Sequence, residues 1–146
     1  MMKSVLLALL LVAFTSSGCS RFPGDYQTAA SQPRSPTTID GPWQGSWKSA
    51  TGNSGRLRCL LASEYRGDGI WCAARFEAKF WGLFTAHYTV QLNGTRQGEA
   101  AHLSGDQDLG GLEGGKYHYE ATITPTRFDA TYRSPVDHGE FHLARP

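Results

Sequence analysis

Residues 117–133 read YHYEATITPTRFDATYR, and the spacing of the apolar residues in this stretch decides the fold class. On each side of Pro125 the apolar residues fall at every second position. A period of two is that of a β-strand with one apolar and one polar face, whereas a helix repeats about every 3.6 residues. The stretch therefore predicts two neighbouring strands joined by a turn at Pro125.

The same alternation extends outward to Trp43 on one side and to Leu143 on the other, and Asn93-Gly94 is a strong hairpin-turn signal within it. This alternation predicts about eight strands, each with a single apolar face, and such strands must cover a common core. We therefore predict that residues 42–146 form an all-β domain, an eight-stranded antiparallel up-and-down barrel. Such an interior holds side chains or one small ligand. The alternative is a two-sheet β-sandwich.

The composition agrees with one small β domain and argues against a nucleic-acid partner. The chain has 146 residues, of which 12% are aromatic and 17 are glycine, a composition that favours strands and tight turns. Its formal net charge is +1, and its Lys and Arg residues are scattered. The protein therefore has no broad positive field to attract nucleic acid.

The N-terminus has the layout of a secretory signal peptide. Lys3 precedes an apolar run from Val5 to Phe14 that is too short to span a bilayer. The following Ser17-Gly18-Cys19 resembles the lipobox of bacterial lipoproteins. The resemblance implies that residues 1–18 are removed, that the Cys19 thiol receives a diacylglycerol, and that the new amine is acylated by a fatty acid such as palmitate. It also implies anchoring at the outer membrane, because Ser20 stands where that family has its inner-membrane retention aspartate.

Residues 19–41 link the anchor to the barrel. After Cys19 they are polar, interrupted by Pro23, Pro33 and Pro36, and without apolar periodicity. Since such a segment buries too little apolar surface to order itself, we expect a flexible tether.

Cys59 and Cys72 are the two cysteines that remain if Cys19 carries lipid, and an oxidising compartment favours their pairing. A two-residue turn at Gly67-Asp68 would place Cys59 opposite Phe76, too far from Cys72 for a disulfide. A four-residue loop over 64–67 would instead place the two cysteines opposite each other. We therefore predict that loop and a Cys59–Cys72 disulfide.

The domain as a whole is similar to the small calycin barrels, which include lipocalins, avidins and bacterial protease-inhibitor barrels. The features that carry the resemblance are Gly45-Ser46-Trp47 on the first strand, eight short strands, and Arg145 at the end of the last one. The resemblance implies that Trp47 packs against Arg145 at the closed end of the barrel. No position matches the biotin-binding residues of avidins, so no biotin site is carried over.

No catalytic, cofactor or metal site is predicted. The chain lacks a Gly-x-Ser-x-Gly nucleophile elbow, and the disulfide would occupy both core cysteines. His138, Glu140 and His142 share the solvent face of the last strand, but the two histidines lie about 13 Å apart, too far to hold one zinc ion. The class indicated is a non-enzymatic protein.

The candidate ligand-binding residues are aromatic. The inward positions of the strands line the interior with Tyr88, Tyr117, Tyr119 and Tyr132. The segment 80–84, FWGLF, breaks the alternation and is either a hydrophobic lip that includes Trp81 and Phe84 or a corner of the core bent at Gly82.

The function predicted from these features is that of a lipid-anchored envelope module that binds a small apolar ligand or a protein partner. The alternatives are a periplasmic hydrolase inhibitor of the protease-inhibitor type and a structural envelope subunit. The size of the interior separates these hypotheses, because a cavity of a few hundred Å³ supports a ligand and a filled interior excludes one.

Overall fold

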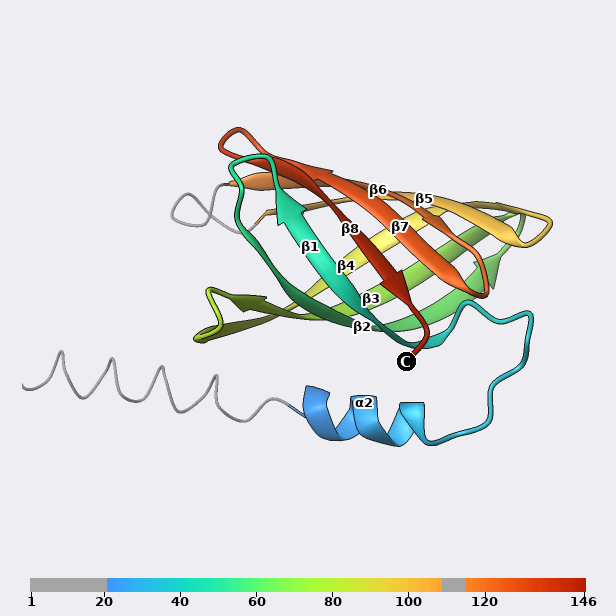
Figure 1. The fold of residues 1–146 in the computed structure, drawn as a ribbon. Helices are drawn as coiled ribbons and strands as arrows, with labels where there is room; N and C mark the ends of the chain where they lie inside the picture. Colours follow the sequence, from blue (N-terminus) through green and yellow to red (C-terminus); the bar gives the residue numbers. More distant parts are fainter. Residues whose placement is uncertain (1–20, 109–114) are drawn as a thin grey trace, which may run out of the picture.

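A computed structural model describes residues 21–108 and 115–146 of the chain. Eight strands close into one barrel in which each strand pairs with the next and β8 returns to β1 (Figure 1). All eight pairings are antiparallel, which confirms the predicted up-and-down barrel and excludes the sandwich. The strands are β1 (Gly41–Ser49), β2 (Ser54–Arg66), β3 (Gly69–Phe80), β4 (Phe84–Gln97), β5 (Ala100–Asp108), β6 (Lys116–Ile123), β7 (Arg127–Arg133) and β8 (His138–Ala144).

Aromatic rings fill the middle of the barrel. Phe76, Phe128 and Phe141 meet there with ring centroids 5.5 to 6.3 Å apart, and all three are buried. Trp43 packs edge-on against Phe128 at 5.7 Å and is fully buried. Edge-to-face contacts of this kind stabilise a core beyond the area that they bury.

Trp43 and Arg145 plug one end of the barrel. The Arg145 guanidinium lies over the Trp43 indole and donates hydrogen bonds to the main-chain oxygens of Thr38, Asp40, Pro42 and Pro125. The predicted pairing of Trp47 with Arg145 is therefore wrong. Trp47 lies four residues further along β1, about 13 Å towards the other end, where its indole N–H donates to the oxygen of Lys79.

The predicted flexible tether is wrong for residues 21–40. Helix α2 (Phe22–Ala30) lies against the outside of the barrel, with Phe22 and Tyr26 buried (Figure 1). Pro23 does not break this helix because it lies in the first turn, where no helical hydrogen bond to its nitrogen is needed. Within the described ranges, no helix is long and apolar enough to cross a membrane. Cys19 and residues 1–18 lie outside the described residues.

The register of β2 and β3 contradicts the predicted loop and disulfide. The turn is the two-residue Gly67-Asp68, with Arg66 opposite Gly69. Cys59 is therefore opposite Phe76, Cys72 is opposite Ser63, and both thiols are free. Gly67 adopts a φ of 60°, a left-handed conformation that lets the chain turn within two residues.

The turn predicted at Asn93-Gly94 is also wrong. Strand β4 continues through both residues to Gln97, and the chain turns after it, at Gly98 and Glu99. A side chain at Gly94 would collide with the main-chain oxygen of His102 on β5. Gly94 is therefore required for close approach of two strands and not for a turn.

Candidate functional site

A cavity of about 270 Å³ lies inside the barrel at the end opposite Trp43. The turns β1–β2, β3–β4 and β7–β8 lie at this end, which we call the hairpin end (Figure 1). The cavity volume is near the lower limit of small-molecule sites, which span about 300–1,000 Å³. The cavity is lined mostly by aromatic residues: Trp47, Phe80, Trp81, Tyr88, Tyr117, Tyr119, Tyr132 and Phe141, with Ser49, Asn53, Leu57, Ala78 and Asp137.

The four tyrosines named from the sequence all line this cavity. Tyr117 stacks on Tyr119 at 6.4 Å and meets Tyr132 at 6.2 Å. Tyr88 stacks on Phe76, one of the rings in the middle of the barrel, with ring centroids 5.3 Å apart. Because period two places alternate residues inside, the sequence identified these positions without knowledge of the register.

Hydrogen bonds hold several polar groups of the cavity in place. Ser49 donates a hydrogen bond of 2.6 Å to one Asp137 carboxylate oxygen, and Tyr132 donates one of 3.4 Å to the other. Tyr119 donates to Gln107 at 3.5 Å. The Tyr88 hydroxyl has no hydrogen-bond partner among the described residues. It therefore remains available to a bound molecule.

Burial keeps these phenols protonated. It raises the pKa of Tyr132 to about 12, with the Asp137 carboxylate adding to the effect. Burial also raises the pKa of Tyr88 well above its ordinary value, with further contributions from Tyr119 and other neighbours. At neutral pH both hydroxyls are neutral hydrogen-bond donors, suited to an acceptor atom on a largely apolar molecule.

The segment 80–84 forms an exposed hairpin, so the alternative of a core corner is wrong. Trp81, Leu83 and Phe84 are 68%, 83% and 60% exposed, whereas Phe80 packs against Trp47 at 5.0 Å. Trp81 has a φ of 51°, in the left-handed region that a bulky residue seldom occupies. The hairpin thus holds three large apolar side chains in solvent, and Trp81 also borders the cavity.

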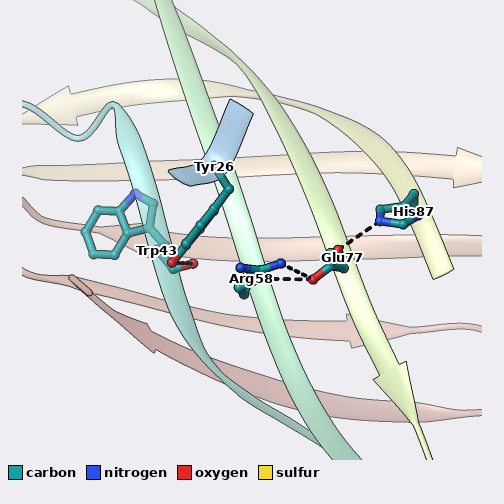
Figure 2. Close-up of polar contacts among 5 residues, drawn as sticks. All are labelled: Tyr26, Trp43, Arg58, Glu77 and His87. Atoms are coloured by element: carbon teal, nitrogen blue, oxygen red, sulfur yellow. Dashed lines mark hydrogen bonds and ion pairs between the residues drawn. The ribbon is translucent and has the colours of Figure 1, made fainter. Parts of the chain in front are cut away.

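A second polar cluster lies outside the barrel, under helix α2. Arg58, Glu77 and His87 form a row across β2, β3 and β4 (Figure 2). Glu77 accepts hydrogen bonds of 2.6 and 2.9 Å from Arg58 and one of 3.0 Å from His87. Above the row, the Arg58 guanidinium lies 4.6 Å from the ring centre of Tyr26, whose hydroxyl donates to the oxygen of Trp43.

The charge of Glu77 is balanced by these partners. Desolvation is the largest single influence and raises the pKa of Glu77, but the hydrogen bonds from Arg58 and His87, with their charges, outweigh it and leave that pKa lowered. The sequence pattern placed these three residues on the solvent face and so missed the cluster. The signal that could have found it is the spacing of Phe22 and Tyr26, four apart on one side of a helix.

Two histidines on the outer face of β6–β8 form ion pairs with carboxylates. His118 contacts Asp106 at 2.8 Å and Glu120 at 2.7 Å, and His142 contacts Asp129 at 2.6 Å. These hydrogen bonds raise the pKa of both imidazoles. In the part of the chain that the structure describes, no group of three or more His, Cys, Asp or Glu residues is arranged to hold a metal ion.

No protein-family model and no curated protein matches the chain. The barrel is similar to solved structures of designed proteins. A redesigned β-barrel, mFAP1, bound to DFHBI, is 13% identical over 78% of this chain and 100% of the designed one, with a TM-score of 0.51. A de novo designed fluorescence-activating β-barrel is 11% identical over 73% of this chain and 93% of its own, with a TM-score of 0.50. At these identities the likeness shows the fold alone.

Proposed function

We propose that this protein is a non-enzymatic, outer-membrane lipoprotein, anchored through Cys19, whose barrel binds a small and largely apolar molecule. The cavity at the hairpin end supports this proposal most directly. It is lined mostly by aromatic rings, and one of its lining residues is Tyr88, whose hydroxyl has no hydrogen-bond partner among the described residues. An aromatic cavity with a few fixed polar groups is the usual form of a small-molecule site.

The ligand expected for this cavity is flat and carries at least one hydrogen-bond acceptor. Its rings stack on the tyrosines, and its acceptor atom accepts a hydrogen bond from the Tyr88 hydroxyl. The likeness to a designed barrel bound to DFHBI supports the capacity of such a barrel to hold a small molecule. It does not identify the ligand.

Purification from bacterial membranes followed by mass spectrometry tests both parts of the proposal. The intact chain is expected to begin at Cys19 and to carry the mass of its acyl groups. Native mass spectrometry is expected to show a co-purified small molecule. A chain without acyl groups would overturn the anchor. A co-purified hydrolase would favour the inhibitor hypothesis, and larger assemblies of the chain would favour a structural subunit.

The cavity itself is tested with the dye 8-anilinonaphthalene-1-sulfonate. The substitution Ala78→Phe fills the cavity from β3 and is expected to abolish dye fluorescence, while Tyr88→Phe removes only the hydroxyl. Loss of one hydrogen bond of about 1 kcal/mol weakens binding roughly fivefold. Tyr65→Phe is the matched control, because Tyr65 is exposed near the opposite end of the barrel. Dye binding that Ala78→Phe leaves unchanged would overturn the cavity as the site.

A further inference from the structure

We propose that the hairpin residues Trp81, Leu83 and Phe84 insert into the bilayer surface beside the lipid anchor, so that the cavity faces the membrane. This inference rests on the proposed lipidation of Cys19. The partner of the exposed apolar hairpin is a bilayer that contains anionic phospholipid. Three features support it: the position of helix α2, the reach of the chain before it, and the charges around the hairpin.

Contacts of Phe22 and Asp25 with the barrel fix the direction of helix α2. Phe22 packs against His87 with ring centroids 5.8 Å apart, and Asp25 forms an ion pair with Arg75 at 3.0 Å. The helix therefore starts towards the hairpin end and runs towards the plugged end (Figure 1). Pro23, in the first turn, shares a surface groove with Lys79 and Thr85.

That groove brings the start of the helix next to the apolar hairpin. Lys79 and Thr85 are paired across β3 and β4, and the next pair along these strands is Phe80 with Phe84. Cys19 precedes Arg21 by two residues, a span of at most about 7 Å of extended chain. A lipid on Cys19 therefore holds the bilayer close to Trp81, Leu83 and Phe84.

The surroundings of the hairpin suit an anionic membrane surface. Arg21, Arg56 and Lys79 are exposed at the hairpin end, and the last two line the same groove as Pro23. Basic side chains near a bilayer are attracted to anionic lipids, and tryptophan is enriched at the headgroup level. An exposed apolar cluster with cations beside it is thus complementary to the surface to which the chain is tethered.

Orientation of the hairpin towards the membrane gives the cavity a source of ligand. Trp81 lines the cavity and is also 68% exposed, so its indole connects the interior to the membrane-facing surface. An apolar molecule dissolved in the bilayer can then reach the tyrosines without crossing water. The ligand class that follows is a membrane-dissolved small molecule.

Depth-dependent fluorescence quenching tests this arrangement with the full lipoprotein extracted from membranes. The protein is reconstituted into vesicles of phosphatidylcholine and phosphatidylglycerol, with or without phosphatidylcholine brominated near the headgroup end of its acyl chains. Bromine is expected to quench the tryptophan emission of the wild type. Trp81→Phe is expected to lose most of that quenching, because it removes the inserted indole. The double variant Leu83→Ser/Phe84→Ser is expected to lose it by withdrawing the hairpin.

Trp71→Phe is the matched control, because Trp71 is also partly exposed but lies near the β2–β3 turn, away from the hairpin end. It is expected to leave the quenching unchanged. Vesicle flotation and intact mass are measured on the same samples. If lipidated protein floats with the vesicles but shows no Trp81-dependent quenching, the insertion of the hairpin is wrong and the proposal of a lipoprotein still holds. Protein that carries no lipid and does not float overturns both. Quenching that depends on Trp81 supports the insertion of the hairpin, whether or not the protein carries lipid.

Discussion

The guanidinium carbon of Arg145 lies 3.8 Å from the centre of the Trp43 ring, although the two residues are 102 positions apart in the sequence. The contact joins the start of β1 to the end of β8 and seals the plugged end. Arg145 also donates four hydrogen bonds to main-chain oxygens there. Its side chain therefore links the end of β8 to the start of β1 and the segment before it.

Arg145→Ala is expected to lower the free energy of unfolding by about 3 kcal/mol, since it removes charged hydrogen bonds and a cation–π contact. Arg145→Lys is expected to recover only part of this loss, because an ammonium cannot reach the four oxygens in the same geometry. Urea unfolding measures both. Arg127→Ala, at a side chain that is 72% exposed, is the control and should change stability by less than about 0.5 kcal/mol. An equal effect of the two alanine variants would contradict the assigned role of Arg145.

Glu77→Gln is expected to cost about 2–3 kcal/mol at pH 7, because Glu77 is only 6% exposed and its partner Arg58 would lose its counter-charge. The pKa of Glu77 is lowered in the fold, so its stabilisation is complete above the unfolded value of about 4.3 and is lost as pH falls through the folded pKa. Urea midpoints from pH 7 to pH 3 should therefore converge for the two proteins. Glu64→Gln is the control and should change the urea midpoint little at any pH, because the Glu64–Arg66 pair is exposed to solvent.

Asp129→Asn is expected to lower the pKa of His142 and to leave that of His118 unchanged, because His118 is paired with Asp106 and Glu120 instead. Nuclear magnetic resonance titration of the imidazole protons measures both values. The raised pKa of His142 stabilises the fold fully below the unfolded value of about 6.5, and this contribution is lost as pH rises through the folded pKa. The contribution is small because the His142 side chain is 57% exposed. A parallel decrease in both pKa values would contradict this pairing.

Cys59 and Cys72 are expected to react slowly with 5,5′-dithiobis(2-nitrobenzoic acid) in the folded protein and rapidly in urea. Burial raises the pKa of both thiols, that of Cys72 to about 12 with a further contribution from Asp40. The reactive thiolate is therefore scarce at neutral pH. Intact mass after alkylation in urea without reductant should show both thiols modified. An unmodified pair would mean that the disulfide forms after all.

The period-two pattern is sufficient to predict the barrel and the inward tyrosines, since it depends on local sequence alone. The errors concern features that pair distant parts of the chain. A loop longer than the turn at Gly67-Asp68 follows only if Cys59 is assumed to pair with Cys72. Gly94 resembles a turn residue because a glycine needed for close strand contact has the same local signature as one in a hairpin.

The helix and the outer cluster could not be predicted from alternation. Phe22 and Tyr26 are two apolar residues in a polar segment, and the barrel surface that covers them is made of Arg58, Arg75 and His87. In the sequence, polar residues that pack against the aromatic rings of a helix cannot be distinguished from polar residues that face solvent. The position of the cavity is likewise set by the register, which leaves Trp43 at one end and four tyrosines at the other.

The plug formed by Trp43 and Arg145 also has a kinetic consequence. Because this plug closes one end of the barrel, a ligand of the proposed kind would enter and leave through the hairpin end. The surface in front of the hairpin end would then set the dissociation rate of that ligand.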